Sequence, residues 1–266
     1  MRTYQNRALG CLAGLAMLFG SCGAVKAAFV VVNNDEWTLS NTGFGNAPDA
    51  GVFAQNVASL FSGGGSGDFL AYSSNFGLTQ NSLANTMTGA GHTWTVSTAV
   101  SFDLPTLQTY DGVFLAGPVG GGAPDTAVLT QYVQGGGNVY LAGGTGVFTG
   151  GATGEAAVWN PFLNSFGLAF GSPFNGVGGN IPIGSSHPIF ANVDTLYQNN
   201  GSDALDIDVS DPRGEVLVSF NGHDLYAIFD STNTSPIPEP STLIIWSLLG
   251  GIGIGIGCWP RRRRRG

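Results

Sequence analysis

Cysteine is scarce in this chain of 266 residues, and its positions matter more than its number. The three cysteines are Cys11, Cys22 and Cys258, each in an apolar run near one end of the sequence. The long central part therefore has no disulfide, no thiolate nucleophile and no metal site with a cysteine ligand. We expect its stability to come from the burial of apolar side chains.

Positive charge is also nearly missing from the centre. Residues 28–240 contain all 17 acidic residues and a single basic residue, Arg213, which gives this part a net charge of −16. Proteins bind nucleic acids mainly by placing lysine and arginine against phosphates. This balance excludes nucleic acid as a partner, and it disfavours phosphorylated ligands.

The first 27 residues have the pattern of a secretory signal peptide. Arg2 and Arg7 precede an apolar run over residues 8–19, and small residues follow. Val25 and Ala27 fit the positions before a signal peptidase cut, which we place directly before Ala28. A permanent membrane anchor is the alternative, but the apolar run is short for one.

The other end of the chain has the pattern of a transmembrane segment. Residues 241–259 contain no charge, and 19 helical residues span about 28 Å, enough to cross a bilayer. Residues 232–240 form a polar linker that ends in a Pro-Glu-Pro motif, and residues 260–266 form a basic tail. By the positive-inside rule, this tail is cytoplasmic and the acidic region lies outside the cytoplasm. The motif is Pro238, Glu239 and Pro240, and the tail carries Arg261, Arg262, Arg263, Arg264 and Arg265.

The motif, span and basic tail together resemble the PEP-CTERM protein-sorting signal of exopolysaccharide-producing Gram-negative bacteria. The resemblance covers residues 236–266. It implies that an exosortase, a membrane protease-transpeptidase, cuts near Pro238–Pro240 and removes the tail. The protein would then be anchored in the inner membrane with its domain on the periplasmic side, and later reach the cell surface or the medium, with exopolysaccharide as a candidate partner. An ordinary tail anchor is the alternative.

The central part is expected to form one α/β domain over residues 28–231. Apolar runs that predict strands alternate with segments whose apolar residues recur at helical spacing, which indicates a mostly parallel sheet with flanking helices. Near the C-terminal end, short strands at 205–209, 215–220 and 225–229 predict antiparallel additions to the sheet edge. Asn221-Gly222 is a strong hairpin signal between the last two. The earlier expected strands are residues 28–33, 68–72, 92–96, 112–116 and 138–142, and the helices begin near Pro48, Thr79 and Pro124 and include Trp159.

Residues 110–117, the following helix and residues 135–141 resemble the class I glutamine amidotransferase-like, flavodoxin-type fold. In active members of that family, the turn after the strand at 139–141 presents a catalytic cysteine, and here Gly144 stands at that position. The family's later His-Pro-Glu element is matched only by His187-Pro188-Ile189, without the glutamate. The resemblance therefore implies the fold and a domain that has lost the activity, with no cofactor.

Three other interpretations of the centre remain open. The glycine turns with Gly117, Gly143, Gly144 and Thr145 follow strands, where open parallel sheets bind ligands, and a neutral ligand such as a sugar suits the acidic surface. A surface hydrolase would use Thr145 as nucleophile and His187 or His223 as base. A calcium-dependent binding module would use the carboxylates of Asp203, Asp206, Asp208 and Asp211. The main expectation is a non-catalytic surface or extracellular-matrix protein, with carbohydrate as its candidate ligand.

Overall fold

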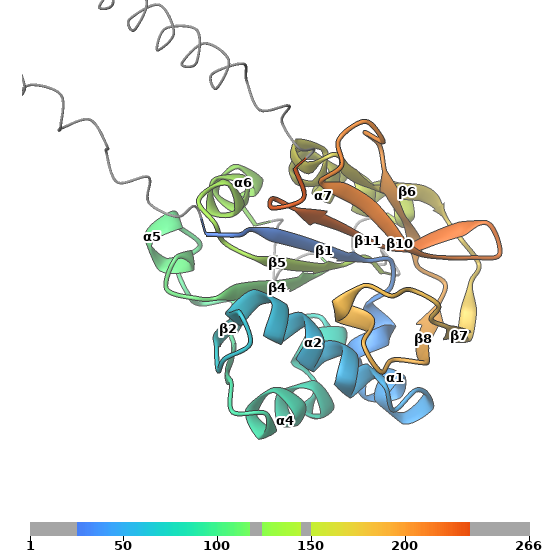
Figure 1. Ribbon diagram of the computed structural model, residues 1–266, viewed down its shortest axis with the longest axis horizontal. Coiled ribbons are helices and arrows are strands. Elements are labelled where there is room, and N and C mark those ends of the chain that lie inside the picture. Colours follow the sequence, from blue (N-terminus) through green and yellow to red (C-terminus); the bar gives the residue numbers. More distant parts are fainter. Residues whose placement is uncertain (1–25, 118–123, 145–149, 235–266) are drawn as a thin grey trace, which may run out of the picture.

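A seven-stranded mixed sheet forms the centre of the domain (Figure 1). The computed structural model describes residues 26–117, 124–144 and 150–234. The sheet has the order β10-β11-β1-β5-β4-β2-β3, and all the pairs from β1 to β3 are parallel. Its parallel strands are β1 (Phe29–Asn33), β2 (Asp68–Ala71), β3 (Thr93–Val96), β4 (Gly112–Ala116) and β5 (Val139–Ala142). The predicted α/β class with a mostly parallel sheet is confirmed.

Helices cover both faces of this sheet (Figure 1). α2 (Ala50–Ser62) and α4 (Asn81–Gly89) lie on one face, while α6 (Thr126–Gln134) and α7 (Ala152–Leu163) lie on the other. Every residue of β1, β4 and β5 is buried, as expected for strands covered on two sides. Alternate residues of the strands therefore belong to two separate apolar cores. Phe53 of α2 lies in one core and Trp159 of α7 in the other.

The ends of these helices follow from local chemistry. α2 stops at Gly63, whose φ of +67° is the left-handed conformation that glycine adopts without strain. α6 begins after Asp125, whose carboxylate accepts hydrogen bonds from the backbone N–H groups of Ala127 at 2.9 Å and Val128 at 3.2 Å. The start of α6 agrees with the predicted helix start near Pro124.

The order of the parallel strands bears on the expected flavodoxin-type topology. That topology arranges five parallel strands in the order 2-1-3-4-5. Here the parallel strands lie in the order β3-β2-β4-β5-β1. This matches 2-1-3-4-5 only if β2 is counted as the first strand and β1 as the fifth. The strand order reverses between β2 and β4, which is where open sheets of this class place ligands.

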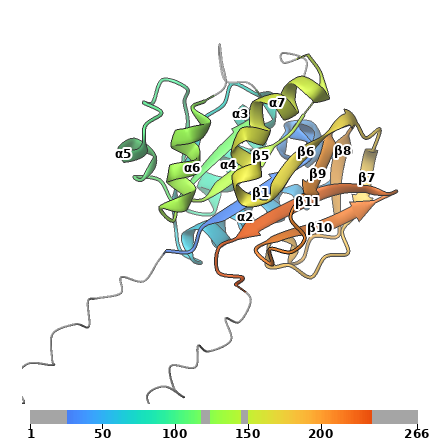
Figure 2. The same ribbon diagram turned by 90° about the horizontal axis from the view of Figure 1, so that it is seen from above.

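Two antiparallel strands extend the sheet beyond β1 (Figure 2). β11 (His223–Asp230) pairs with β1, and β10 (Gly214–Phe220) forms the edge. Between them, Asn221 and Gly222 have φ angles of 52° and 81°, as the predicted tight hairpin requires. Both antiparallel additions and their turn are confirmed.

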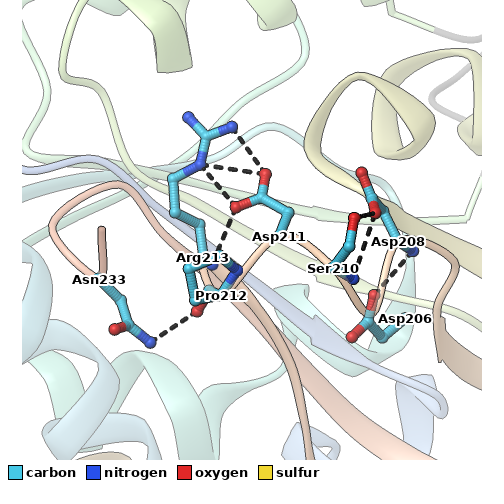
Figure 3. Close-up of polar contacts among 7 residues, drawn as sticks. All are labelled: Asp206, Asp208, Ser210, Asp211, Pro212, Arg213 and Asn233. Atoms are coloured by element: carbon cyan, nitrogen blue, oxygen red, sulfur yellow. Dashed lines mark hydrogen bonds and ion pairs between the residues drawn. The ribbon is translucent and has the colours of Figure 1, made fainter. Parts of the chain in front are cut away.

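The expected third strand of this set, at residues 205–209, is wrong. β9 (Ser202–Asp206) starts three residues earlier and pairs with β6 (Leu168–Phe174) in a separate two-stranded sheet. Beyond it the chain turns, and Ile207 and Val209 are 51% and 89% exposed. The backbone N–H of Asp208 donates to the Asp206 carboxylate at 2.9 Å (Figure 3). This local hydrogen bond stabilises a turn at the place where the apolar pattern of the sequence predicted a strand.

The remaining elements are short and pack around the edges of the sheet. The strands β7 (Gly178–Pro182) and β8 (Thr195–Asn199) form another antiparallel pair. Within the described ranges, no helix has the length and apolar character to cross a membrane, and the predicted span at 241–259 lies outside them. The short helices are η1 (Glu36–Leu39), α1 (Asn41–Asn46), α3 (Phe76–Thr79), α5 (Leu104–Leu107), η2 (Asn164–Phe166) and η3 (Pro188–Phe190).

A buried asparagine ties three elements of the domain together. The Asn138 side chain accepts from the Phe29 N–H at 3.0 Å and donates to the carbonyls of Phe61 at 3.2 Å and Asp111 at 2.8 Å.

Asn138→Ala leaves these buried groups without partners, so we expect the free energy of unfolding to fall by about 2–4 kcal/mol. Urea denaturation measures the loss. The exposed Asn85→Ala on α4 is the control and should change stability by less than about 0.5 kcal/mol; an equal effect of both would contradict this role.

Candidate functional site

The carboxyl ends of the parallel strands meet at one edge of the sheet. There Asn33 at the end of β1 pairs with Ala142 at the end of β5, and Ala116 at the end of β4 pairs with Ala142 from the other side. The loops that follow β1, β2, β4 and β5 therefore converge, as the strand ends of an open parallel sheet do. This edge contains the glycine turns that the sequence singled out.

Gly144 follows β5 by two residues and lies between two carboxyl groups. Its backbone N–H donates to Glu155 Oε2 of α7 at 3.0 Å. A Cβ atom built on Gly144 would overlap with Glu36 Oε2, because that carboxyl group occupies the space where a side chain would stand. Any residue larger than glycine therefore has to displace Glu36.

Glu36 also connects this turn to the loop after β2. The Asn75 amide donates a hydrogen bond to Glu36 Oε2, and Asn75 Oδ1 accepts from the Gly77 N–H at 2.7 Å. Gly117, at the end of β4, has a φ of +60°, and a Cβ there would stand 3.0 Å from the Asn75 amide nitrogen. Asn75 thus links Glu36 to the point between β2 and β4 where the strand order reverses.

Glu155 is the most unusual carboxyl group of this edge. Its side chain is in the first turn of α7 and the residue is 1% exposed. The pKa of Glu155 is raised to about 7, chiefly because burial penalises the ionised form; the charge of Glu36 adds to this rise, and the bond from Gly144 opposes it. Glu155 Oε1 has no hydrogen-bond partner in the part of the chain that the structure describes. A proton on this oxygen relieves the repulsion between the two carboxyl groups.

Asp35 is a third buried acid beside them, and its role is structural. Its carboxylate accepts from the Trp37 N–H at 2.9 Å, which caps η1, and from the Asn199 N–H of β8. Burial raises the pKa of Asp35 to about 7, against the opposing effect of these two bonds. Next to it, the Asn33 amide donates to the Tyr140 hydroxyl at 2.8 Å. These bonds fix the path of the chain from β1 into η1.

His187 does not face this site. Its Nδ1 accepts from the Ile189 N–H at 3.4 Å, so the side chain caps η3, and η3 packs against α2. Burial lowers the pKa of His187, and the charges of Glu215 and Asp230 oppose that change. Phe190 of the same η3 stacks on Phe53 of α2, with ring centres 5.3 Å apart, so His187 lies with η3 on the face of the sheet that α2 covers.

His223 is placed differently. It begins β11, which runs antiparallel to β1, so it lies at the same edge of the sheet as Gly144. Its Nδ1 lies 3.0 Å and 3.1 Å from the two carboxylate oxygens of Asp203, and both side chains are partly exposed. A histidine oriented by a carboxylate is the arrangement that a general base requires. The partner proposed for it, Thr145, lies outside the described residues.

The four aspartates of the calcium interpretation make separate local contacts, and Figure 3 shows three of them, Asp206, Asp208 and Asp211. Asp203 pairs with His223, and Asp206 and Asp208 accept hydrogen bonds within the turn after β9. Asp211 binds the Arg213 guanidinium at 2.7 Å. Among the described residues, no group of three or more histidine, cysteine, aspartate or glutamate side chains is arranged to hold a metal ion.

Sequence reasoning located the glycine turn but missed the carboxyl groups around it. Asp35 and Glu36 directly follow β1, and acids at that position of a buried strand are a signal for this edge. Glu155 has no such signal, because its place depends on how α7 packs. The sorting motif and the arginine tail lie outside the described residues. Comparison with family models, with curated proteins and with solved structures gives no match to this chain.

The raised pKa of Glu155 predicts a specific pH dependence. The folded protein binds this proton more tightly than the unfolded chain, whose glutamate has a pKa of 4.5, so stability falls as the pH rises from about 4.5 through 7. Glu155→Gln removes the ionisation but keeps an oxygen for Gly144. We expect this variant to be more stable than the wild type by about 1–3 kcal/mol at pH 8 and to gain less at pH 5.

Urea denaturation at both pH values measures this difference. Glu215→Gln on the exposed edge strand β10 is the matched control, because it removes the same charge without altering a buried group. The burial argument fails if Glu155→Gln destabilises the protein equally at both pH values, or if the control gives the same gain.

Proposed function

We propose that this protein is an exported surface or extracellular-matrix protein whose domain is a non-catalytic relative of the flavodoxin-type, class I glutamine amidotransferase-like fold. The observation that carries this proposal is the occupation of the space beside Gly144 by Glu36, with Glu155 bonded to the Gly144 N–H. In an active member a nucleophile projects from this position. Here the position offers no side chain, and the space for one is taken by the Glu36 carboxyl group.

The two carboxyl groups also oppose the chemistry of an acyl-transfer site. Such a site stabilises the developing negative oxygen with free N–H donors. The Gly144 N–H is already bonded to Glu155, and the adjacent Glu36 carboxyl group would repel an oxyanion. A binding or structural role therefore fits this edge better than hydrolysis.

The delivery of the domain is the second part of the proposal, and it is supported by the sequence. We propose that signal peptidase removes residues 1–27 and that residues 241–259 hold the domain on the periplasmic side of the inner membrane. An exosortase-type protease then cuts near Pro238–Pro240, and the domain reaches the surface. Thr234 is the last described residue, so residues 235–240 of the linker and the expected span lie outside the described part of the chain.

Intact-mass measurement of the protein from its native host tests this delivery. We expect a species that begins at Ala28, ends near Pro238–Pro240 and lacks the five arginines. Replacing Pro238, Glu239 and Pro240 together by alanine should leave the tail attached, while Pro236→Ala, the matched proline change outside the motif, should not. A surface-exposed wild-type protein that keeps its arginine tail would refute the sorting proposal.

A second candidate function, a surface hydrolase, is favoured by one observation. The Asp203–His223 pair at 3.0 Å supplies an oriented base at the correct edge of the sheet, whereas His187 caps a turn elsewhere. Of the two histidines considered for Thr145, His223 is therefore the one that the geometry supports. This candidate needs a hydroxyl within hydrogen-bond reach of His223.

Hydrolysis of a panel of p-nitrophenyl esters and glycosides separates the two candidates. The non-catalytic proposal predicts no turnover above background for the wild type. If turnover occurs and is lost by at least about a hundredfold in both Thr145→Ala and His223→Ala, but not in His187→Ala, the hydrolase is correct instead. Circular dichroism of each variant shows whether the fold is kept.

A further inference from the structure

A groove of about 380 Å³ lies at the edge of the sheet opposite to Gly144. Ala28 and Ser231, where the described domain begins and ends, both line it, and they are joined by two hydrogen bonds. Phe229, which pairs with Val30 near the start of β1, forms part of its apolar wall. A volume of this size is within the range of sites for small molecules.

The groove gathers the positive charge of the domain. Lys26 and Arg213 are the only two basic residues in the sequence from 26 to 234, and both line it. The same stretch contains 16 of the 17 acidic residues. An anion is repelled from most of this surface, so the groove is the place where a negatively charged ligand is attracted.

Arg213 is held in place by its surroundings. Asp211 accepts from Nε at 2.9 Å and from Nη2 at 2.7 Å (Figure 3). The guanidinium group lies 5.3 Å from the centre of the Phe229 ring. A guanidinium has five N–H donors, and the Nη1 donors take no part in the bonds to Asp211. Arg213 therefore keeps hydrogen-bonding capacity in a fixed orientation, which suits a carboxylate.

The second positive charge persists if the signal peptide is removed. Lys26, which contacts Asp111 at 3.5 Å, precedes the predicted cut and would leave with the signal peptide. The cut converts the backbone nitrogen of Ala28 into an ammonium group. Ala28 lines the same groove, and its nitrogen donates to Oγ of Ser231, another lining residue, at 2.8 Å. The uncut and the cut protein both present two positive charges here.

Neutral hydrogen-bonding groups make up the rest of the polar lining. Gln134 of α6, Ser165 of η2 and Ser231 supply an amide and two hydroxyls beside Arg213. These groups match the hydroxyls of a sugar. Because Asp211 and Asp111 already pair with Arg213 and Lys26, the groove suits one carboxylate better than a doubly charged phosphate.

We propose that this groove binds a sugar acid, with the carboxylate on Arg213 and on the N-terminal cation, and with the ring hydroxyls on Gln134, Ser165 and Ser231. The proposal names a ligand class for the carbohydrate association, but it does not depend on the sorting of the tail. If the protein binds a sugar acid but keeps its tail, the sorting proposal fails and the binding proposal stands. If it loses its tail but binds no sugar acid, the reverse holds.

Isothermal titration of the full-length protein in detergent micelles tests the proposal. Galacturonate is the probe, galactose is the neutral match, and acetate and inorganic phosphate are the anions without a sugar ring. We expect galacturonate to bind at least about tenfold more tightly than each of the other three, because only it offers both the charge and the hydroxyls. Equal binding of galactose, acetate or phosphate, or no binding of galacturonate, overturns the proposal.

Variants locate the binding. Arg213→Gln should weaken galacturonate binding by about tenfold or more, and Arg213→Lys should recover part of it, since it keeps the charge but not the planar fork. Ser165→Ala should weaken binding several-fold. Ser219→Ala, the same change on the hairpin at the opposite edge of the sheet, should leave it unchanged. Thermal melting shows whether Arg213→Gln and Arg213→Lys are folded. If both are folded and bind galacturonate as tightly as the wild type does, the groove is not the binding site.

Discussion

The hydrogen bond from the Gly144 N–H to the buried Glu155 carboxyl group, with Glu36 packed against the same glycine, organises the carboxyl edge of the sheet. It fastens α7 to the end of β5, and the bond from Asn75 to Glu36 adds the loop after β2. Two carboxyl groups in this position are costly when both are ionised, because burial and mutual repulsion oppose it. A proton on Glu155 and the donors Gly144 N–H and Asn75 amide reduce that cost. The result is a closed, acidic edge around Gly144.

Much of the fold could be predicted from the sequence because local residue patterns determine its elements. The buried run of β1 and the helical spacing around Phe53 are signals of a single element, and Gly63 and Asn221-Gly222 are required by their backbone angles. The error at residues 205–209 has a local cause as well. Alternating apolar residues predict a strand, but aspartates that bind neighbouring N–H groups hold a turn there instead. β1 pairs with β5, which lies more than 100 residues later in the chain. No local residue pattern predicts a pairing between segments so far apart.

The candidate site was predictable only in part. Position and glycine content identified the turn after β5, since parallel strands end at one edge. The carboxyl groups that fill it come from two distant segments, Glu36 after β1 and Glu155 in α7, and their meeting depends on tertiary packing. The groove at the other edge is similar, because Lys26 and Arg213 are 187 positions apart in the numbering and meet only where the domain begins and ends. The scarcity of lysine and arginine did not predict that the two would line one groove, each paired with an aspartate.

The protonation of Glu155 is the most direct test of the claim that buried carboxyl groups close the edge where a nucleophile would act. Carbon-detected NMR of the glutamate side-chain carboxyl carbons, titrated from pH 4 to pH 9 and assigned with Glu155→Gln, measures it in the folded protein. The account predicts a midpoint for Glu155 near 7. A midpoint near the ordinary 4.5 would mean that this carboxyl group is solvated and that the edge is open, which would contradict the account.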